Sequence, residues 1–138
     1  MDKSIFDEMI QTRRLLHTIP EEGWTEFHTT YIVSERLKTL GFTDIRLGKQ
    51  IIKPEAVLGR NPDVVRSAIA RAIEEGVPEE FIRNINEYTG CVAVLDTGRE
   101  GPVTAFRFDM DCNPVEETND PEHLPNKLGF RSKHPGLM

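Results

Sequence analysis

The chain has 138 residues, 38% of them hydrophobic, which is enough for the core of one domain. Its 23 acidic side chains outnumber the 17 basic ones and give a net charge of −6. No run of lysine or arginine is available to neutralise phosphates, so we expect no nucleic-acid partner. The charged N-terminus and the lack of a long apolar stretch predict no membrane association, and 2 cysteines without metal-ligand spacing fit a cytoplasmic protein.

Residues 4–17 predict a first helix. Ser4 and Asp7 are placed to cap its start, and Pro20 ends the segment. The apolar side chains that recur on one face are Ile5, Phe6, Met9, Ile10 and Leu16.

Residues 25–40 predict a second helix, and residues 44–52 predict a strand. Gly41 is expected to end the helix in a left-handed conformation, with Phe42 packed back over the end. The strand shows apolar alternation that Gly48 interrupts. The apolar stripe expected on the helix consists of Ile32, Val33, Leu37 and Leu40.

Residues 61–76 predict a third helix, because Asn61 is a cap residue followed by proline and apolar side chains then recur at helical spacing up to Gly76. Pro78 opens a further short helix. Two apolar runs, at residues 91–96 and 103–110, are joined by a turn-rich segment and predict a hairpin. From residue 113 onward we expect loop.

Two motif blocks resemble a known family. The first is residues 13–26 (RRLLHTIPEEGWTE). The second, residues 90–111, is a strand, a glycine turn and a strand ending in Asp-Met-Asp, with Pro114 and Glu117 after it. Both resemble the amidohydrolase branch of the zinc peptidases, which includes hippurate, auxin-conjugate and aminobenzoyl-glutamate hydrolases. The resemblance implies an α/β fold, with helices packed on a partial sheet, as the incomplete front portion of a zinc-peptidase-like catalytic domain over residues 1–138.

Residues 54–88 are interpreted as a helical insertion within this domain. The segment is similar to one that aminobenzoyl-glutamate hydrolases carry at this place. Within the family, the chain therefore resembles that group most. In the family, a His-Ala-Cys-Gly-His-Asp type segment follows the Asp-Met-Asp strand and supplies the first metal ligands. Residues 1–138 contain no such segment, so the resemblance implies the front of an enzyme without its metal site.

Asp109 and Asp111 are the candidate site residues. They stand two positions apart at the end of a predicted strand, so both side chains are expected to point toward a site at its C-terminal edge. From the residues alone, solvated carboxylates at a strand end are the simpler interpretation. The resemblance implies that Asp111 is an active-site aspartate that orients a metal-ligand residue. It also places Asp109 where other branches have a histidine ligand, although Asp109 itself is not predicted to bind metal.

His28 and His123 are not predicted to be metal ligands, because neither has partners at ligand spacing, whereas a full-length chain could bring His134 near the site. His17 is expected at the C-terminal end of the first helix, where an imidazolium is favourable. His28 and His123 are expected at the surface and His134 in a loop. Cys91, inside an apolar run, is expected to be a small buried side chain.

The function implied by the resemblance is hydrolysis of N-acyl amino acid amides such as p-aminobenzoyl-glutamate. The intact enzyme would use zinc or manganese, bind a small-molecule N-acyl amino acid, and form a homo- or hetero-oligomer with a second subunit. The present chain is expected to be an inactive truncated segment without a metal, with unpaired sheet edges and little cooperativity in unfolding. The alternative is a non-catalytic binding or assembly module that pairs with a complete subunit.

Overall fold

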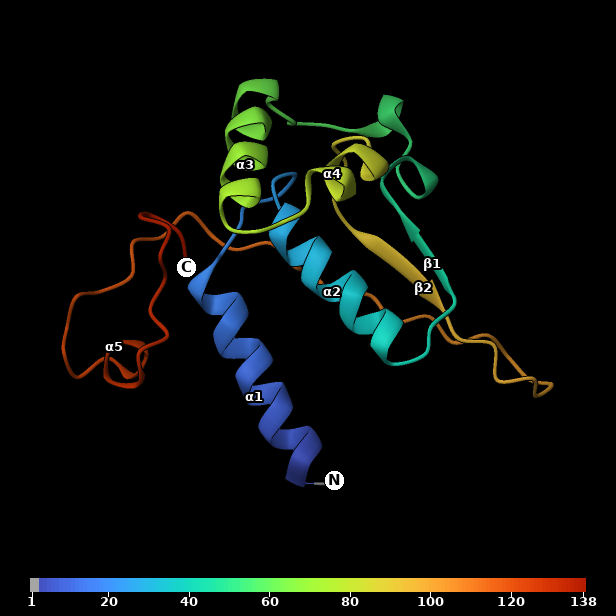
Figure 1. Cartoon of the computed structure of the whole chain (residues 1–138), viewed down its shortest axis with the longest axis horizontal. Coiled ribbons are helices and arrows are strands. Elements are labelled where there is room, and N and C mark those ends of the chain that lie inside the picture. Colours follow the sequence, from blue (N-terminus) through green and yellow to red (C-terminus); the bar gives the residue numbers. More distant parts are fainter. Residues whose placement is uncertain (1–2) are drawn as a thin grey trace. The chain divides into compact units, whose positions relative to one another are not determined.

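The computed structural model describes residues 3–138, and its elements fall into two compact units (Figure 1). The central unit is Trp24–Met110, and the terminal unit combines Met1–Gly23 with Asp111–Met138. None of the helices within residues 3–138 has both the length and the apolar character needed to cross a membrane.

The central unit contains the helices α2 (Phe27–Thr39), α3 (Pro62–Glu74) and α4 (Glu79–Ile85), all of which were predicted. At the end of α2, Gly41 has φ +89° and the N–H of Phe42 donates to the carbonyl of Leu37 at 3.1 Å. At the start of α3, the Asn61 side chain accepts a hydrogen bond from the N–H of Asp63 at 2.9 Å. The glycine stop and the asparagine cap are therefore confirmed.

The buried face of α2 differs from the predicted stripe. Leu40 is exposed, and Ile32, Val33 and Leu37 are only partly buried. The chain that follows α4 instead approaches the small hydroxyl side chains of the helix, and the N–H of Gly90 donates to Thr30 Oγ1 at 2.9 Å. The side chains that α2 buries are those of Phe27, Thr29, Thr30 and Ser34.

The hydrophobic core of the central unit lies among α2, α3 and α4. The Phe81 ring meets Tyr31 of α2 edge-on, with ring centroids 5.0 Å apart. Apart from Phe27, every buried member of this core comes from residues 54–88, so the predicted helical segment supplies most of the interior of the unit. The buried members are Phe27, Val65, Ala68, Ala72, Val77, Phe81, Ile82 and Ile85.

The sheet of the central unit consists of β1 (Asp44–Leu47) and β2 (Cys91–Val94), and α2 contacts both strands. The strands are antiparallel, with Asp44 opposite Val94 and Leu47 opposite Cys91. β1 stops before Gly48, where the sequence predicted an interruption.

The predicted hairpin between residues 91–96 and 103–110 is wrong. β2 pairs with β1 instead, and residues 103–110 form no strand in the described chain. The connecting segment 97–102 is longer than the roughly two to five residues that usually set hairpin register, so it does not force the two runs to pair. An extended segment becomes a strand only where a neighbour takes up its backbone hydrogen bonds.

The terminal unit contains α1 (Lys3–Thr18) and α5 (Leu124–Leu128). The first helix is confirmed, and within the described residues it already includes Lys3. Its apolar side chains Ile5, Phe6 and Met9 are exposed in the described chain. The short helix α5 corrects the prediction of loop throughout residues 113–138, because Pro125 in its first turn and Gly129 after its last are local start and stop signals.

Candidate functional site

Asp109 lies exposed in the extended segment at the end of the central unit. The guanidinium of Arg107 binds its carboxylate, with Nη2 at 2.5 Å from Oδ1 and Nη1 at 3.0 Å from Oδ2. Side chains at i and i+2 share one face of an extended chain, so the pair forms locally. Asp109 is thus an exposed carboxylate with its own counter-charge.

Asp111 is the first residue of the terminal unit's second segment and is also exposed. The next residue, Cys112, is fixed by its backbone N–H, which donates to the carbonyl of Glu21 at 2.8 Å. Burial raises the pKa of the Cys112 thiol, and the negative charges of Glu22, Asp111 and Glu21 raise it further. Residues 103–110 form no strand in the described chain, and the role of Asp111 rests on the resemblance.

Glu117 is a buried carboxylate of the terminal unit that binds several side-chain and backbone donors. Its side chain is only 1% exposed. Oε1 lies 3.0 Å from Nε2 of both His17, in the last turn of α1, and His123, just before α5. Oε2 accepts the backbone N–H of Ser132 at 2.7 Å. One buried carboxylate therefore joins three separate segments, and we refer to Glu117, His17, His123 and Ser132 as the Glu117 cluster.

The electrostatics of the Glu117 cluster favour the ionised carboxylate. Burial acts to raise the pKa of Glu117, but the hydrogen bonds from His17, Ser132 and His123 outweigh it and hold the pKa below its ordinary value. Because an ionised carboxylate can only accept, both imidazoles donate from Nε2. Three N–H donors thus hold the carboxylate in place, which is a positioning arrangement rather than a reactive one.

A pocket of about 330 Å³ opens beside this cluster in the terminal unit. His134 is buried there, and its Nδ1 lies 2.6 Å from the carbonyl oxygen of Pro20. A carbonyl can only accept, so Nδ1 carries a proton. The residues that line the pocket are Glu116, Glu117, Arg131, Ser132, Lys133, His134, Pro135 and Leu137.

The histidines are less exposed than the sequence predicted. His123 binds Glu117, and His28, which was expected at the surface, is largely buried with Nδ1 3.0 Å from Glu75 Oε2. His17 does lie in the last turn of α1, as predicted. His134 lies in a loop as expected but is buried. Except for His123, their partners stand far away in the sequence, so spacing alone could not indicate them. The one available signal was Glu117, which lies shortly after the second motif block.

Within residues 3–138, no group of three or more His, Cys, Asp or Glu side chains is placed to hold a metal ion. In the Glu117 cluster, three N–H donors already bind the two oxygens of the carboxylate. In the central unit, Cys91 is partly buried, and burial raises the pKa of its thiol, which fits the predicted role as a small packed side chain. Both cysteines are free thiols.

Comparison of the sequence with known proteins indicates the class of enzymes that the chain resembles. No protein-family model matches the chain. Proteins similar to nearly all of it carry the names of enzymes that cleave amide or peptide bonds, namely hydrolases of amino acid conjugates, carboxypeptidases and a deacetylase. The chain is thus related to amide-bond hydrolases.

Particular relatives narrow this class. A homologue of a p-aminobenzoyl-glutamate hydrolase subunit, from Haemophilus influenzae, is 44% identical over 96% of this chain. The indole-3-acetyl-aspartic acid hydrolase of Enterobacter agglomerans is 40% identical over 99% of it. The crystal structure of an aminobenzoyl-glutamate utilization protein from Klebsiella pneumoniae matches 80% of the chain with a TM-score of 0.74 and 37% identity. The chain is similar to proteins named as aminobenzoyl-glutamate hydrolases, as its motifs predicted, and the α/β fold class is confirmed.

The match covers only a part of each relative. The chain spans 31% of the Haemophilus and Enterobacter proteins and 28% of the solved Klebsiella chain. This share agrees with the prediction of an N-terminal segment of such a hydrolase.

Proposed function

We propose that this chain is the front part of a hydrolase that cleaves the amide between an aromatic acyl group and an acidic amino acid. The observation that carries the proposal is the identity of 44% and 40%, over nearly the whole chain, to hydrolases named for p-aminobenzoyl-glutamate and indole-3-acetyl-aspartic acid. Both named compounds join an aromatic acyl group to glutamate or aspartate. In the cleavage, the oxygen of water adds to the acyl carbon, the C–N bond breaks, and the amino acid leaves after its nitrogen takes up a proton.

Within that enzyme, Asp111 is the active-site aspartate and acts by orienting a metal-ligand side chain. Its place in the second motif block supports this role, and Asp109 is a weaker candidate because Arg107 already binds it. Zinc or manganese would belong to the intact enzyme, as the resemblance implies. The Haemophilus relative is named for one subunit of its hydrolase, which supports a second subunit, and the free thiols support a cytoplasmic location.

A chimera tests the proposal. The matched region of the Haemophilus relative is replaced by this chain, and hydrolysis of p-aminobenzoyl-glutamate and indole-3-acetyl-aspartate is measured with zinc or manganese. We expect hydrolysis to be retained and Asp111→Asn to lower kcat by about 10- to 100-fold. Glu100→Gln, an exposed acidic position in the turn after β2, is the matched control and should leave kcat unchanged. A folded chimera that hydrolyses neither compound would refute the proposal.

The isolated chain provides the complementary measurement. We expect no hydrolysis of p-aminobenzoyl-glutamate by the purified chain with zinc or manganese, and measurable turnover would contradict its inactivity. The alternative of an assembly module without a hydrolase role is not favoured, because the matches over the whole chain are to hydrolases.

A further inference from the structure

The short segment that carries Asp111 is fixed by backbone hydrogen bonds to two other parts of the terminal unit. The N–H of Cys112 donates to the carbonyl of Glu21 at 2.8 Å. The N–H of Asn113 donates to the carbonyl of Met138 at 3.2 Å, and the N–H of Met138 donates back to the carbonyl of Asn113 at 3.2 Å. The position of Asp111 therefore depends on the turn that follows α1 and on the loop that ends at Met138.

His134 contacts both of these parts. The residue is 6% exposed, and its Nδ1 donates to the carbonyl oxygen of Pro20 at 2.6 Å, one residue before the carbonyl that fixes the Asp111 segment. Its own carbonyl accepts the N–H of Leu137 at 3.2 Å, which closes the turn that leads to Met138. One buried residue thus joins the two backbone contacts that place Asp111.

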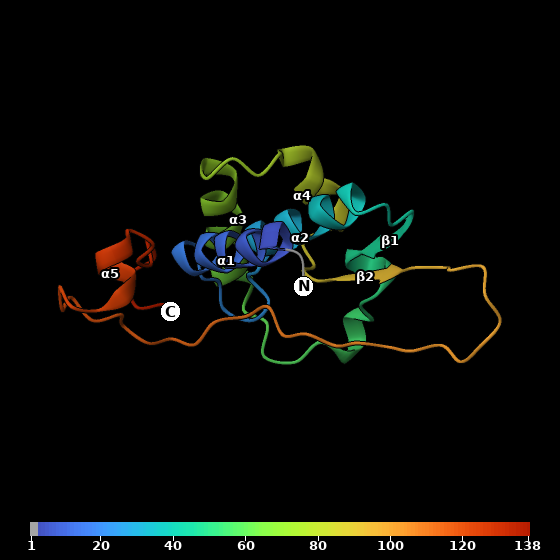
Figure 2. The same ribbon diagram turned by 90° about the horizontal axis from the view of Figure 1, so that it is seen from below.

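The backbone of His134 is itself held in place. Its N–H donates to Ser132 Oγ at 3.1 Å, and Ser132 Oγ donates to the carbonyl of His134 at 3.0 Å. The N–H of Lys133 donates to the carbonyl of Thr18, the last residue of α1, at 2.9 Å. Figures 1 and 2 both show this last part of the chain, in red, beside the end of α1. The imidazole is therefore presented to Pro20 from a fixed backbone.

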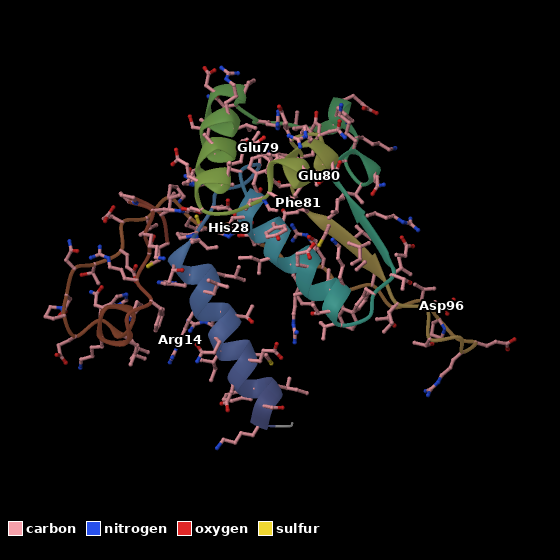
Figure 3. All side chains as sticks on the ribbon, viewed as in Figure 1. Arg14, His28, Glu79, Glu80, Phe81 and Asp96 are labelled. Carbon is pink, nitrogen blue, oxygen red and sulfur yellow. The ribbon has the colours of Figure 1, made fainter. Side chains whose placement is uncertain are left out.

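The end of α1 is held by side chains that do not involve His134. Arg14, labelled in Figure 3, places its guanidinium carbon 5.1 Å from the centroid of the Phe130 ring. The His17 ring meets Phe130 edge-on, with centroids 5.5 Å apart, and also binds Glu117. Loss of the His134 imidazole should therefore release the turn after α1 locally and leave the helix in place.

We propose that His134 is a positioning residue of the hydrolase, and that its Nδ1–H bond to Pro20 sets the place of Asp111. The inference rests on the proposed function, in which Asp111 is the active-site aspartate. Asp111 lies outside the helices and strands of the described chain, so these few hydrogen bonds determine where it stands. Active-site groups must be held to within about 0.5 Å by their supporting contacts, so a small shift of the turn matters.

Two other roles fit His134 less well. A catalytic role needs contact with the substrate, whereas the imidazole is buried and its Nδ1 proton is already donated to Pro20. A role in packing alone would not need a donor. Pro20 is buried, however, and its carbonyl would lose this hydrogen bond if an apolar side chain replaced the imidazole.

Variants of the chimera with the Haemophilus relative test the inference. Asn and Leu are similar in size, but only Asn has a side-chain N–H at the place of Nδ1. We expect His134→Leu to lower kcat by about 10-fold and to change KM by less than about twofold, whereas His134→Asn should lower kcat by less than about threefold. The matched control is Lys127→Gln, at an exposed position of α5, which should leave kcat unchanged.

A double-mutant cycle separates positioning from a general loss of structure. If His134 acts through Asp111, His134→Leu should change kcat by less than about twofold when Asp111→Asn is already present. A residue that only maintains the fold would lower kcat by the same factor in both backgrounds. That result would overturn the inference.

Amide hydrogen exchange of the same chimera provides a measurement that needs no turnover. We expect faster exchange at Cys112 in His134→Leu than in His134→Asn, because the turn that accepts its N–H is released. Equal exchange at Cys112 in the two variants would overturn the inference. A folded chimera that hydrolyses neither compound would overturn the proposed function, and faster exchange in its His134→Leu variant would still support the placement of the Asp111 segment by His134.

Discussion

The central and terminal units have interiors of different chemistry. The central unit buries aliphatic and aromatic side chains from α2, α3 and α4. The terminal unit buries Glu21, Glu117 and His134 beside Ile19 and Phe130. Apolar burial is non-directional and nearly independent of pH, whereas a buried carboxylate depends on each of its donors. The two units should therefore respond to different perturbations.

Removing an aromatic side chain from the central core should have the largest effect. Phe27 is fully buried, so Phe27→Ala should lower the free energy of unfolding of the central unit by about 3 to 5 kcal/mol. Trp24 is the single tryptophan of the sequence, so its fluorescence reports the unfolding of this unit in urea. Val64→Ala, on the exposed side of α3, is the control and should cost less than about 0.5 kcal/mol.

A backbone contact in the same unit should be nearly as sensitive. Gly48 has φ +57°, and a Cβ there would overlap the carbonyl oxygen of Ile85. Gly48→Ala should cost about 3 kcal/mol in urea unfolding, because the backbone of α4 must move. Gly41→Ala has the same kind of φ but open space around it, so it should cost only about 1 to 2 kcal/mol. Equal losses for the two variants would contradict the steric explanation.

In the terminal unit, Glu117→Gln should lower stability by about 2 kcal/mol, because an amide offers a single acceptor oxygen to the donors of the Glu117 cluster. Faster amide exchange near Ser132, with unchanged Trp24 fluorescence in urea, is the expected result. Glu122→Gln is an exposed control and should cost less than about 0.5 kcal/mol. An equal loss of stability in the central unit would contradict the claim that the two units respond to different perturbations.

Lowering the pH should also affect the stability of the two units differently. The pKa of Glu117 is held below its ordinary value of 4.5, so this group's stabilisation is complete above that value and is lost as pH falls through the lower folded pKa. Amide exchange in the terminal unit, followed by NMR below pH 4.5, should accelerate more in the native chain than in Glu117→Gln. An identical acid response of the two proteins would show that Glu117 carries no pH-linked stability.

The smallest expected effect concerns a helix cap. Asn61→Ala removes the acceptor for the N–H of Asp63 and should cost about 1 kcal/mol in urea unfolding of the central unit. Ser67→Ala, on the exposed side of the same helix, should change stability by less than about 0.5 kcal/mol. A loss for Asn61→Ala no larger than for the control would show that Pro62 alone sets the start of α3.

Local signals predicted the helices well and the sheet poorly. The cap at Asn61 and the stop at Gly41 act within a few residues, so the sequence indicates them directly. Strand pairing is non-local: β2 could be expected to pair with residues 103–110 or with β1, and apolar alternation cannot distinguish the two. The Glu117 cluster escaped prediction for the same reason, because the His17 partner lies about a hundred residues from Glu117.

The pairing of Leu47 with Cys91 makes the whole α3–α4 region a closed loop of the sheet. The entropic cost of closing a loop rises by only about 0.6 kcal/mol per doubling of loop length, so a long connection between these strands costs little stability. The connection also provides the apolar side chains against which α2 packs. Deleting residues 54–88 would therefore remove most of the buried apolar side chains of the central unit.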